Sequence, residues 1–153
     1  MDEKFLLQNL LSENAELRHT ATHALWNLWF NEYGENAASR IRAGTKLMEN
    51  HQFEKANEVF KNLIAQHPSF AEAHNKLATS LFMQGEYSQS VIECEITLKL
   101  NPYHFGAWNG LGLCLFHLAR YQEAIKSFQT ALTIQPYADI NKSYIAKCRG
   151  QLN

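Results

Sequence analysis

His19 and His23 are the side chains whose type and spacing come closest to supporting chemistry. Four residues apart on a predicted helix, their imidazoles could share one face and hold a metal ion. A structural zinc site needs four ligands, and the pattern places no further histidine, cysteine or carboxylate beside these two. We interpret them as solvent-facing residues of an amphipathic helix, and we expect neither a metal nor a cofactor.

The three cysteines offer no second site. Cys94, Cys114 and Cys148 are odd in number, without close pairing and without metal-ligand spacing. Buried reduced thiols, which suit a cytoplasmic protein, are the expected state. The chain also lacks a phosphate-binding glycine loop, a nucleophile elbow and a metalloprotease histidine pair with its glutamate. The sequence therefore predicts a protein that is not an enzyme.

Charge and hydropathy argue against two classes of partner. The 153 residues include 14 basic and 15 acidic side chains, a formal net charge of −1. Nucleic-acid binders normally carry a basic patch, so we expect no nucleic-acid partner. No apolar run approaches the roughly 18 residues of a membrane span, and the acidic start is unlike a secretory signal.

The elements that carry these residues follow a repeat of 34 residues. Pro68, Pro102 and Pro136 are the only prolines, and each follows the last by 34 positions. A fixed period of this length is typical of solenoid proteins. Other positions keep the same step: Gly44, Ala78 and Gly112; Leu47, Leu81 and Leu115; Phe53, Tyr87 and Tyr121; Ala56, Ser90 and Ala124; Phe60, Cys94 and Phe128.

Each unit has the pattern of two helices joined by a short polar break. Apolar residues recur at helical spacing on both sides of the break, and a proline ends the second helix because it cannot continue one. In the third unit, Gly112 and Ala124 are small enough to let the two helices approach closely.

The third unit resembles a nearly complete tetratricopeptide-repeat motif, carried by Trp108, Leu111, Gly112, Leu115, Tyr121, Ala124, Phe128, Ala131 and Pro136. The resemblance implies an all-α fold, a right-handed superhelix of three helix-turn-helix repeats at 37–70, 71–104 and 105–138. The repeats depart from the motif at Arg40, His74, Ser90, Cys94 and Thr97.

The two ends are expected to cover the solenoid. Residues 139–153 resemble the family's capping helix, with Asp139 as its N-cap and with Ile145 and Ala146 facing repeat three. Residues 1–36 form a helical extension, whose main helix is capped by Ser12 or Asn14. We interpret its aromatic cluster, Trp26, Trp29 and Phe30, as packing on repeat one; the alternative is an exposed aromatic surface.

In this architecture the first helix of each repeat lines the concave face. The side chains one turn apart on those helices are surplus to the repeat's own packing and predict a groove for an extended peptide or an amphipathic helix. They are Ile41, Thr45 and Met48; Asn75, Thr79, Phe82 and Met83; and Asn109, Leu113, Phe116 and His117. Burial of this face by the chain's own termini is the alternative.

A well-known specialisation of the family, the clamp for two carboxylates of chaperone C-termini, is not matched. Its five basic and amide positions fall on Ile41, Thr45, Lys76, Gly106 and Gly110. Glycine has no side-chain charge to hold a carboxylate. We therefore expect a scaffold, adaptor or assembly factor that binds a protein or peptide of unknown identity in another mode. The alternative is a structural self-association module, a homo-oligomer without a separate ligand.

Overall fold

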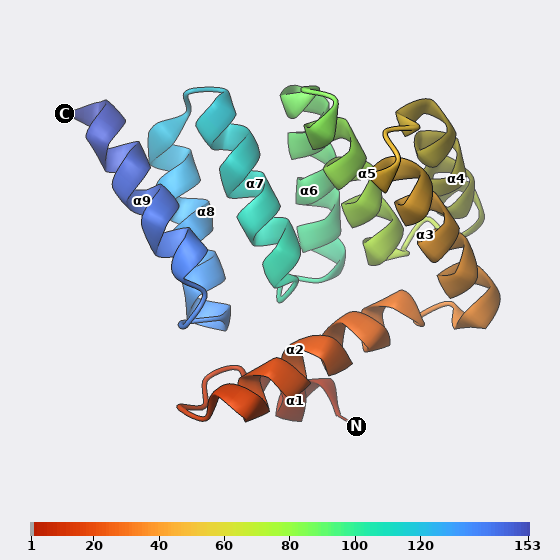
Figure 1. Cartoon of the computed structure of the whole chain (residues 1–153), viewed down its shortest axis with the longest axis horizontal. Helices are drawn as coiled ribbons and strands as arrows, with labels where there is room; N and C mark the ends of the chain where they lie inside the picture. Colours follow the sequence, from red (N-terminus) through yellow and green to blue (C-terminus); the bar gives the residue numbers. More distant parts are fainter. Residues whose placement is uncertain (1) are drawn as a thin grey trace.

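The computed structural model describes residues 2–153 and contains helices only in that range, joined by short turns (Figure 1). The expected all-α fold is confirmed. No helix in the described part of the chain is long and apolar enough to cross a membrane. The nine described helices are α1 (Glu3–Asn9), α2 (Ala15–Phe30), α3 (Gly34–Glu49), α4 (Phe53–Gln66), α5 (Ala71–Met83), α6 (Tyr87–Leu100), α7 (Phe105–His117), α8 (Tyr121–Ile134) and α9 (Asp139–Leu152).

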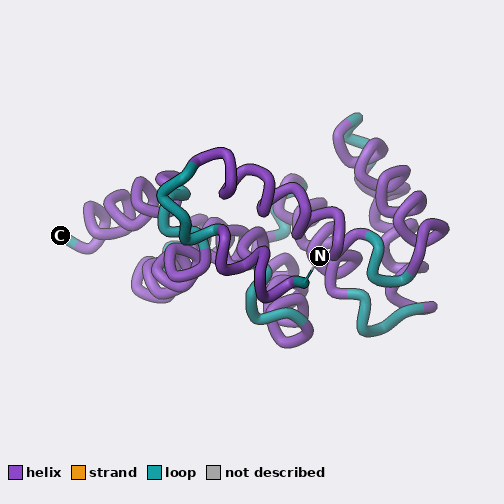
Figure 2. The backbone as a smooth tube through the Cα atoms, turned by 90° about the horizontal axis from the view of Figure 1, so that it is seen from below, coloured by secondary structure: helices purple, strands orange, loops and turns teal. Residues whose placement is uncertain are grey.

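Three hairpins, α3–α4, α5–α6 and α7–α8, stack side by side, and α9 packs against the last of them (Figures 1 and 2). The turn inside each hairpin contains one residue with positive φ, and the three recur with the 34-residue step: His51 at 60°, Gly85 at 79° and Ala119 at 59°. Only glycine adopts this left-handed conformation without steric cost. Two of the three turns are therefore strained.

In the first and third hairpins, a phenylalanine ring packs directly on a glycine. A Cβ atom added at Gly112 would lie 2.6 Å from the Phe128 ring, and one added at Gly44 would lie 2.6 Å from the Phe60 ring. The expected close approach of the two helices at Gly112 is thus confirmed. In repeat two the corresponding positions hold Ala78, which is larger than glycine, and Cys94, which is smaller than phenylalanine.

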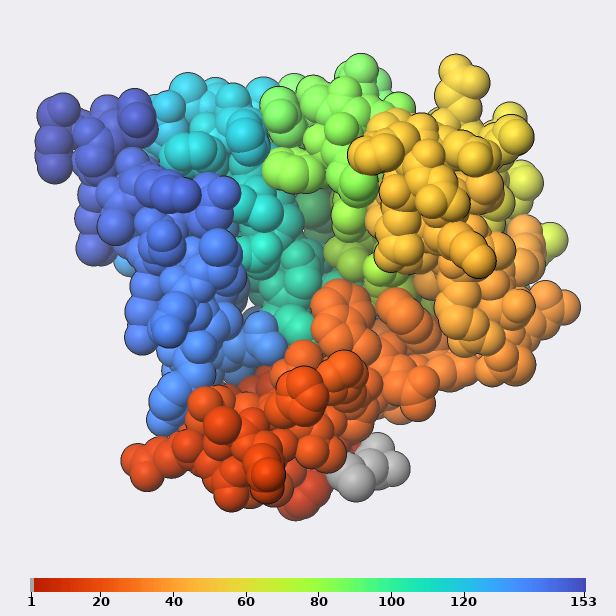
Figure 3. Space-filling view, viewed as in Figure 1, coloured from red at the N-terminus to blue at the C-terminus, as the bar shows by residue number. Residues whose placement is uncertain are grey.

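The N-terminal hairpin α1–α2 does not extend the stack but crosses the lower edge of the array (Figures 1 and 3). Its buried face joins Leu6, Leu10 and Leu25 to Trp29 and to Phe105, the first residue of α7. The expected packing of this helix on repeat one is therefore wrong for both tryptophans. Only Phe30, at the helix end, contacts the core of repeats one and two.

The N-cap predicted from the sequence is found at α2 but not at α9. The Asn14 side chain accepts hydrogen bonds from the first turn of α2, as expected. Asp139, expected to cap α9, is instead its first residue and is paired with Lys142. Ile145 is buried against repeat three, but Ala146 faces solvent, so the expectation for Ala146 is wrong.

Candidate functional site

A slot of about 300 Å³ lies between α5 and α7. The two helices flank it on the face seen in Figure 3, and α6 forms its floor through Ser90 and Cys94. Six of the residues predicted from the sequence to line a groove are found around it: Asn75, Thr79, Phe82, Met83, Asn109 and Leu113.

The predicted groove residues of repeat one do not take part. Ile41 is 0% exposed and Met48 is also buried, and both belong to the core cluster that joins repeats one and two. The expectation that these two side chains face an open groove is wrong, because position 41 is used for packing on the neighbouring repeat. Thr45 is half-buried, and its hydroxyl donates to the Ile41 carbonyl.

Phe116 and His117 lie next to the slot but do not line it. Phe116 packs beneath the capping helix, with its ring centroid 5.3 Å from that of Tyr144. His117 stacks on Tyr87 at 4.7 Å and meets the edge of Phe82 at 5.5 Å. These contacts hold Phe82 in place at the rim of the slot.

The slot exists because two of its positions hold small residues, a glycine and a cysteine. Gly110 faces the floor with only the Cys94 sulfur near it, 3.7 Å from where a Cβ would stand. Position 94, a phenylalanine in the other two repeats, holds the smaller cysteine. Cys94 is buried, whereas Gly110 above it is only partly buried.

The thiol on the floor of the slot is not a nucleophile. Two causes raise the pKa of Cys94 far above its usual value: the larger is a hydrogen bond with Cys114, and the second is burial. The thiol therefore stays protonated at neutral pH, and only a thiolate attacks readily. As expected, Cys94, Cys114 and Cys148 are all buried and free.

The two asparagines of the slot are held by internal partners. Asn75 donates an amide hydrogen to Glu72 Oε1 at 3.1 Å. Asn109 donates to Asn141 Oδ1 at 2.9 Å, and Asn141 in turn donates to the Ala138 carbonyl. These partners are acceptors, so they fix which way each amide points.

A buried polar network joins the slot to the N-terminal hairpin. His104 and Glu72 are both fully buried, and His104 Nε2 donates to Glu72 at 2.9 Å. Nδ1 of His104 accepts from the Ala107 N–H at 3.0 Å and so caps α7, which requires the Nε2–H tautomer. The Trp29 ring stacks on this imidazole at 4.6 Å. Trp26 lies over Gly106, where a Cβ would stand 2.7 Å from the indole.

Sequence reasoning missed this network, because no local pattern relates α2 to the start of α7. A second buried histidine, His74, departs from the repeat motif and has partners of its own. His74 contacts Glu93 at 2.7 Å and the Pro68 carbonyl at 3.0 Å. Burial lowers the pKa of His74, but the hydrogen bonds to Glu93 and Pro68 outweigh it, so the pKa is raised above 6.5.

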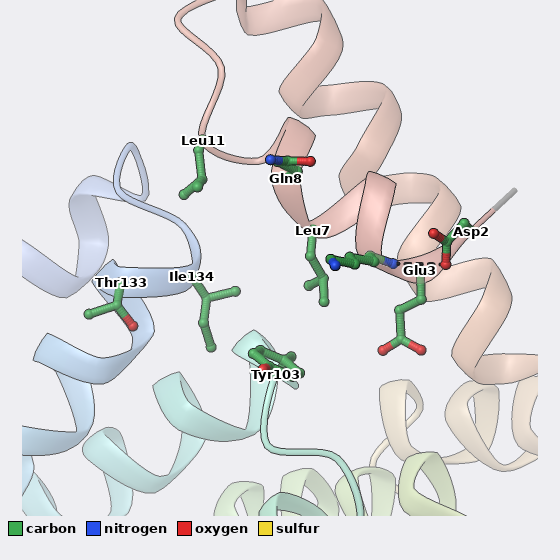
Figure 4. A pocket seen from close by; sticks show the side chains of 9 residues that line it. Asp2, Glu3, Leu7, Gln8, Leu11, Tyr103, Thr133 and Ile134 are labelled. Carbon is green, nitrogen blue, oxygen red and sulfur yellow. Dashed lines mark hydrogen bonds between the residues drawn. The ribbon is translucent and has the colours of Figure 1, made fainter.

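A second, more open hollow of about 700 Å³ lies between α1 and the repeats (Figure 4). Leu7 of α1 and Leu11 of the turn that follows it face Tyr103 and Ile134 across the hollow, with Glu3 at one end. No sequence pattern indicated this hollow, since it arises from the way in which α1 lies beside the ends of repeats two and three.

The metal site considered for His19 and His23 lacks further ligands. The two rings meet edge to face with centroids 4.5 Å apart, and both side chains are exposed. Within residues 2–153, no group of three histidine, cysteine, aspartate or glutamate side chains is arranged to hold a metal ion.

Comparison with known sequences identifies the class of protein. Profiles described as "Tetratricopeptide repeat" match residues 41–103 and 106–137. The chain therefore belongs to the tetratricopeptide-repeat family, as its motif suggested. Proteins of this family are generally binding modules without catalysis of their own.

Among curated proteins, the chain is 32% identical over 91 residues to a TPR repeat-containing protein of Rhizobium etli, which covers 60% of this chain and 45% of that protein. It is 25% identical over 117 residues to small glutamine-rich tetratricopeptide repeat-containing protein 2 of Mycosarcoma maydis, covering 76% of this chain and 33% of that one. The chain thus spans less than half the length of these relatives.

Solved structures match the fold. The first TPR domain of Spaghetti (RPAP3), bound to the HSP90 peptide SRMEEVD, superposes with a TM-score of 0.73 at 18% identity, covering 74% of this chain and 90% of that one. The Sgt2 TPR domain from Aspergillus fumigatus gives 0.70 at 17% identity, covering 74% and 77%. The crystal structure of MamA superposes with a TM-score of 0.69 at 21% identity, covering 72% of this chain and 65% of that one. These likenesses confirm the fold class.

Proposed function

We propose that the chain is a protein-binding scaffold that holds a peptide or an amphipathic helix of its partner in the slot between α5 and α7. The supporting observation is an open, largely apolar hollow flanked by two helices, with Met83 41% exposed at its rim. Exposed apolar side chains around a hollow favour a partner. Because the packed repeats already fix the shape of the slot, binding costs little free energy for ordering the side chains of this chain.

The mode of binding that we propose is not the carboxylate clamp. Ile41 is buried, and Gly110 offers no side-chain charge. The RPAP3 domain binds a peptide that ends in acidic residues, and a chain without the basic positions is expected to bind that peptide poorly.

The test is a selection of peptides displayed on phage against the purified chain, followed by titration of the selected peptides. Met83→Glu should weaken their binding by about tenfold or more, because it places a charge at the rim of an apolar slot. Ile92→Glu is the matched control, since Ile92 is 57% exposed on α6 away from the slot. Equal affinity in the two variants would place the binding surface elsewhere.

Self-association is the alternative function, and apolar exposure near the C-terminus favours it. Tyr137, Ile140 and Leu152 are all exposed there. Size-exclusion chromatography with light scattering over a wide concentration range separates the two functions, because a monomer throughout would argue against self-association. We further propose a cytoplasmic location, because three buried free thiols suit a reducing compartment.

A further inference from the structure

We propose that the slot takes a tryptophan side chain of the bound segment, an inference that rests on the proposed binding function and names the group that is bound. Three properties of the lining favour this side chain: its hydrogen-bonding groups, its lack of charge and the shape that Gly110 creates.

The polar side chains of the slot have hydrogen-bond acceptor atoms that receive no donor from within the chain. Asn75 and Asn109 each point an amide nitrogen at an internal acceptor, and neither Oδ1 accepts a hydrogen bond within the chain. Within residues 2–153, Asn57 Oδ1 is the one buried side-chain nitrogen or oxygen atom without a hydrogen-bond partner. The unpaired Oδ1 atoms of Asn75 and Asn109 are therefore accessible to solvent. The Thr79 hydroxyl donates to the Asn75 carbonyl, so its remaining capacity is also as an acceptor. A ligand that brings a donor completes this wall.

The lining excludes a charged ligand group. None of the side chains around the slot is an acid, a lysine or an arginine, and the Cys94 thiol is protonated. An ammonium or carboxylate entering it would lose its water without gaining an ionic partner, which is strongly unfavourable. The donor must therefore be neutral.

The shape selects a flat apolar body. The slot holds about 300 Å³, near the lower limit of roughly 300–1,000 Å³ for small-ligand pockets, so it accommodates one large side chain. Phe82 offers an aromatic ring and Met83 a thioether, both of which contact aromatic rings favourably. Tryptophan combines a large ring with an N–H that only donates, which matches the spare acceptors.

The probe is N-acetyl-L-tryptophanamide, titrated into the 15N-labelled chain and followed by NMR. Saturable shifts are expected at the Gly110 amide and at the side-chain amides of Asn75 and Asn109. The naphthylalanine analogue has a similar ring but no N–H, so its dissociation constant should be about three- to tenfold higher. N-acetyl-L-tyrosinamide, with a smaller ring, should also bind more weakly.

Gly110→Leu is the decisive variant, because its side chain fills the slot. A Cβ at this position meets only the Cys94 sulfur, at an ordinary 3.7 Å, so the fold should be retained. The shifts should vanish in Gly110→Leu, weaken in Gly110→Ala and persist in Gly150→Leu, where no atom lies within 4 Å of an added Cβ.

Three outcomes would overturn the assignment: shifts that survive in folded Gly110→Leu, equal affinity for the naphthyl analogue, or tighter binding of the tyrosine amide. The proposed function is judged separately. Displayed peptides that lose affinity in Met83→Glu but contain no tryptophan would keep the scaffold function and remove the tryptophan assignment. A chain that selects no peptide removes both.

Discussion

Replacing Gly112 by alanine tests the closest helix contact of the solenoid. The new Cβ would stand 2.6, 2.7 and 2.8 Å from three carbon atoms of the Phe128 ring, whereas carbon atoms pack at about 3.5–4.0 Å. The ring is fully buried, so it cannot move aside into solvent. Overpacking of this kind costs about 1–3 kcal/mol, against about 1 kcal/mol returned by alanine's better helix propensity.

The control is Gly150→Ala, near the end of α9, where an added Cβ meets nothing within 4 Å. That variant should be neutral or up to about 1 kcal/mol more stable, since only the helix propensity changes. Gly112→Ala should therefore be about 1–3 kcal/mol less stable than the control. Urea unfolding followed by far-UV circular dichroism measures the difference.

A second substitution removes the cause of the strain. Phe128→Cys gives repeat three the small residue that repeat two carries at Cys94, opposite Ala78. It should itself destabilise by about 2–4 kcal/mol, because a buried ring is lost. In that background, Gly112→Ala should become stabilising, which gives a positive coupling between the two sites. If Gly112→Ala behaves like Gly150→Ala in the native background, the close contact is misplaced.

Three further predictions follow from the turns and the buried histidines. Ala119→Gly should raise the free energy of unfolding by about 0.5–1 kcal/mol in urea titrations, because it relieves a positive φ; a loss of stability would contradict the strain. Burial lowers the pKa of His74, but Glu93 raises it above 6.5 overall, so the stability that this pair contributes is complete below about pH 6.5 and is lost as pH rises through the folded pKa. Unfolding measured against pH should show this loss in the native chain but not in His74→Gln. Glu72→Ala should destabilise by about 1–3 kcal/mol by leaving His104 without its acceptor, and should red-shift tryptophan emission; an unchanged spectrum would separate this pair from the N-terminal hairpin.

The repeat itself could be derived from the sequence because its information is local and periodic. Gly112 opposite Phe128 and a proline at the end of each second helix indicate close packing and helix ends wherever they occur. The same period also marks the left-handed residue of each turn, although only position 85 holds a glycine, the residue type that indicates a positive φ. Such features depend on neighbours within one hairpin.

The position of α2 could not be derived, because it depends on contacts between distant segments. Trp29 carries no signal that its partner is His104, and an aromatic cluster fits any adjacent apolar surface equally well. The groove prediction failed at Ile41 for a related reason. Helical spacing places a side chain on the concave face, but it does not say whether the neighbouring repeat lies close enough to cover it.

Two departures from the repeat motif, Ser90 and Cys94, lie at the floor of the slot. Where repeats one and three place a phenylalanine ring against a glycine, repeat two has Cys94 and Ala78, so less volume is filled beneath α7. Gly110 then leaves the space above that floor empty, and the amides of Asn75 and Asn109 border it. A repeat that matched the motif at every position would fill this space with its own core. Ser90 and Cys94, two of the residues that weaken the match of repeat two, thus form the floor over which the slot is open.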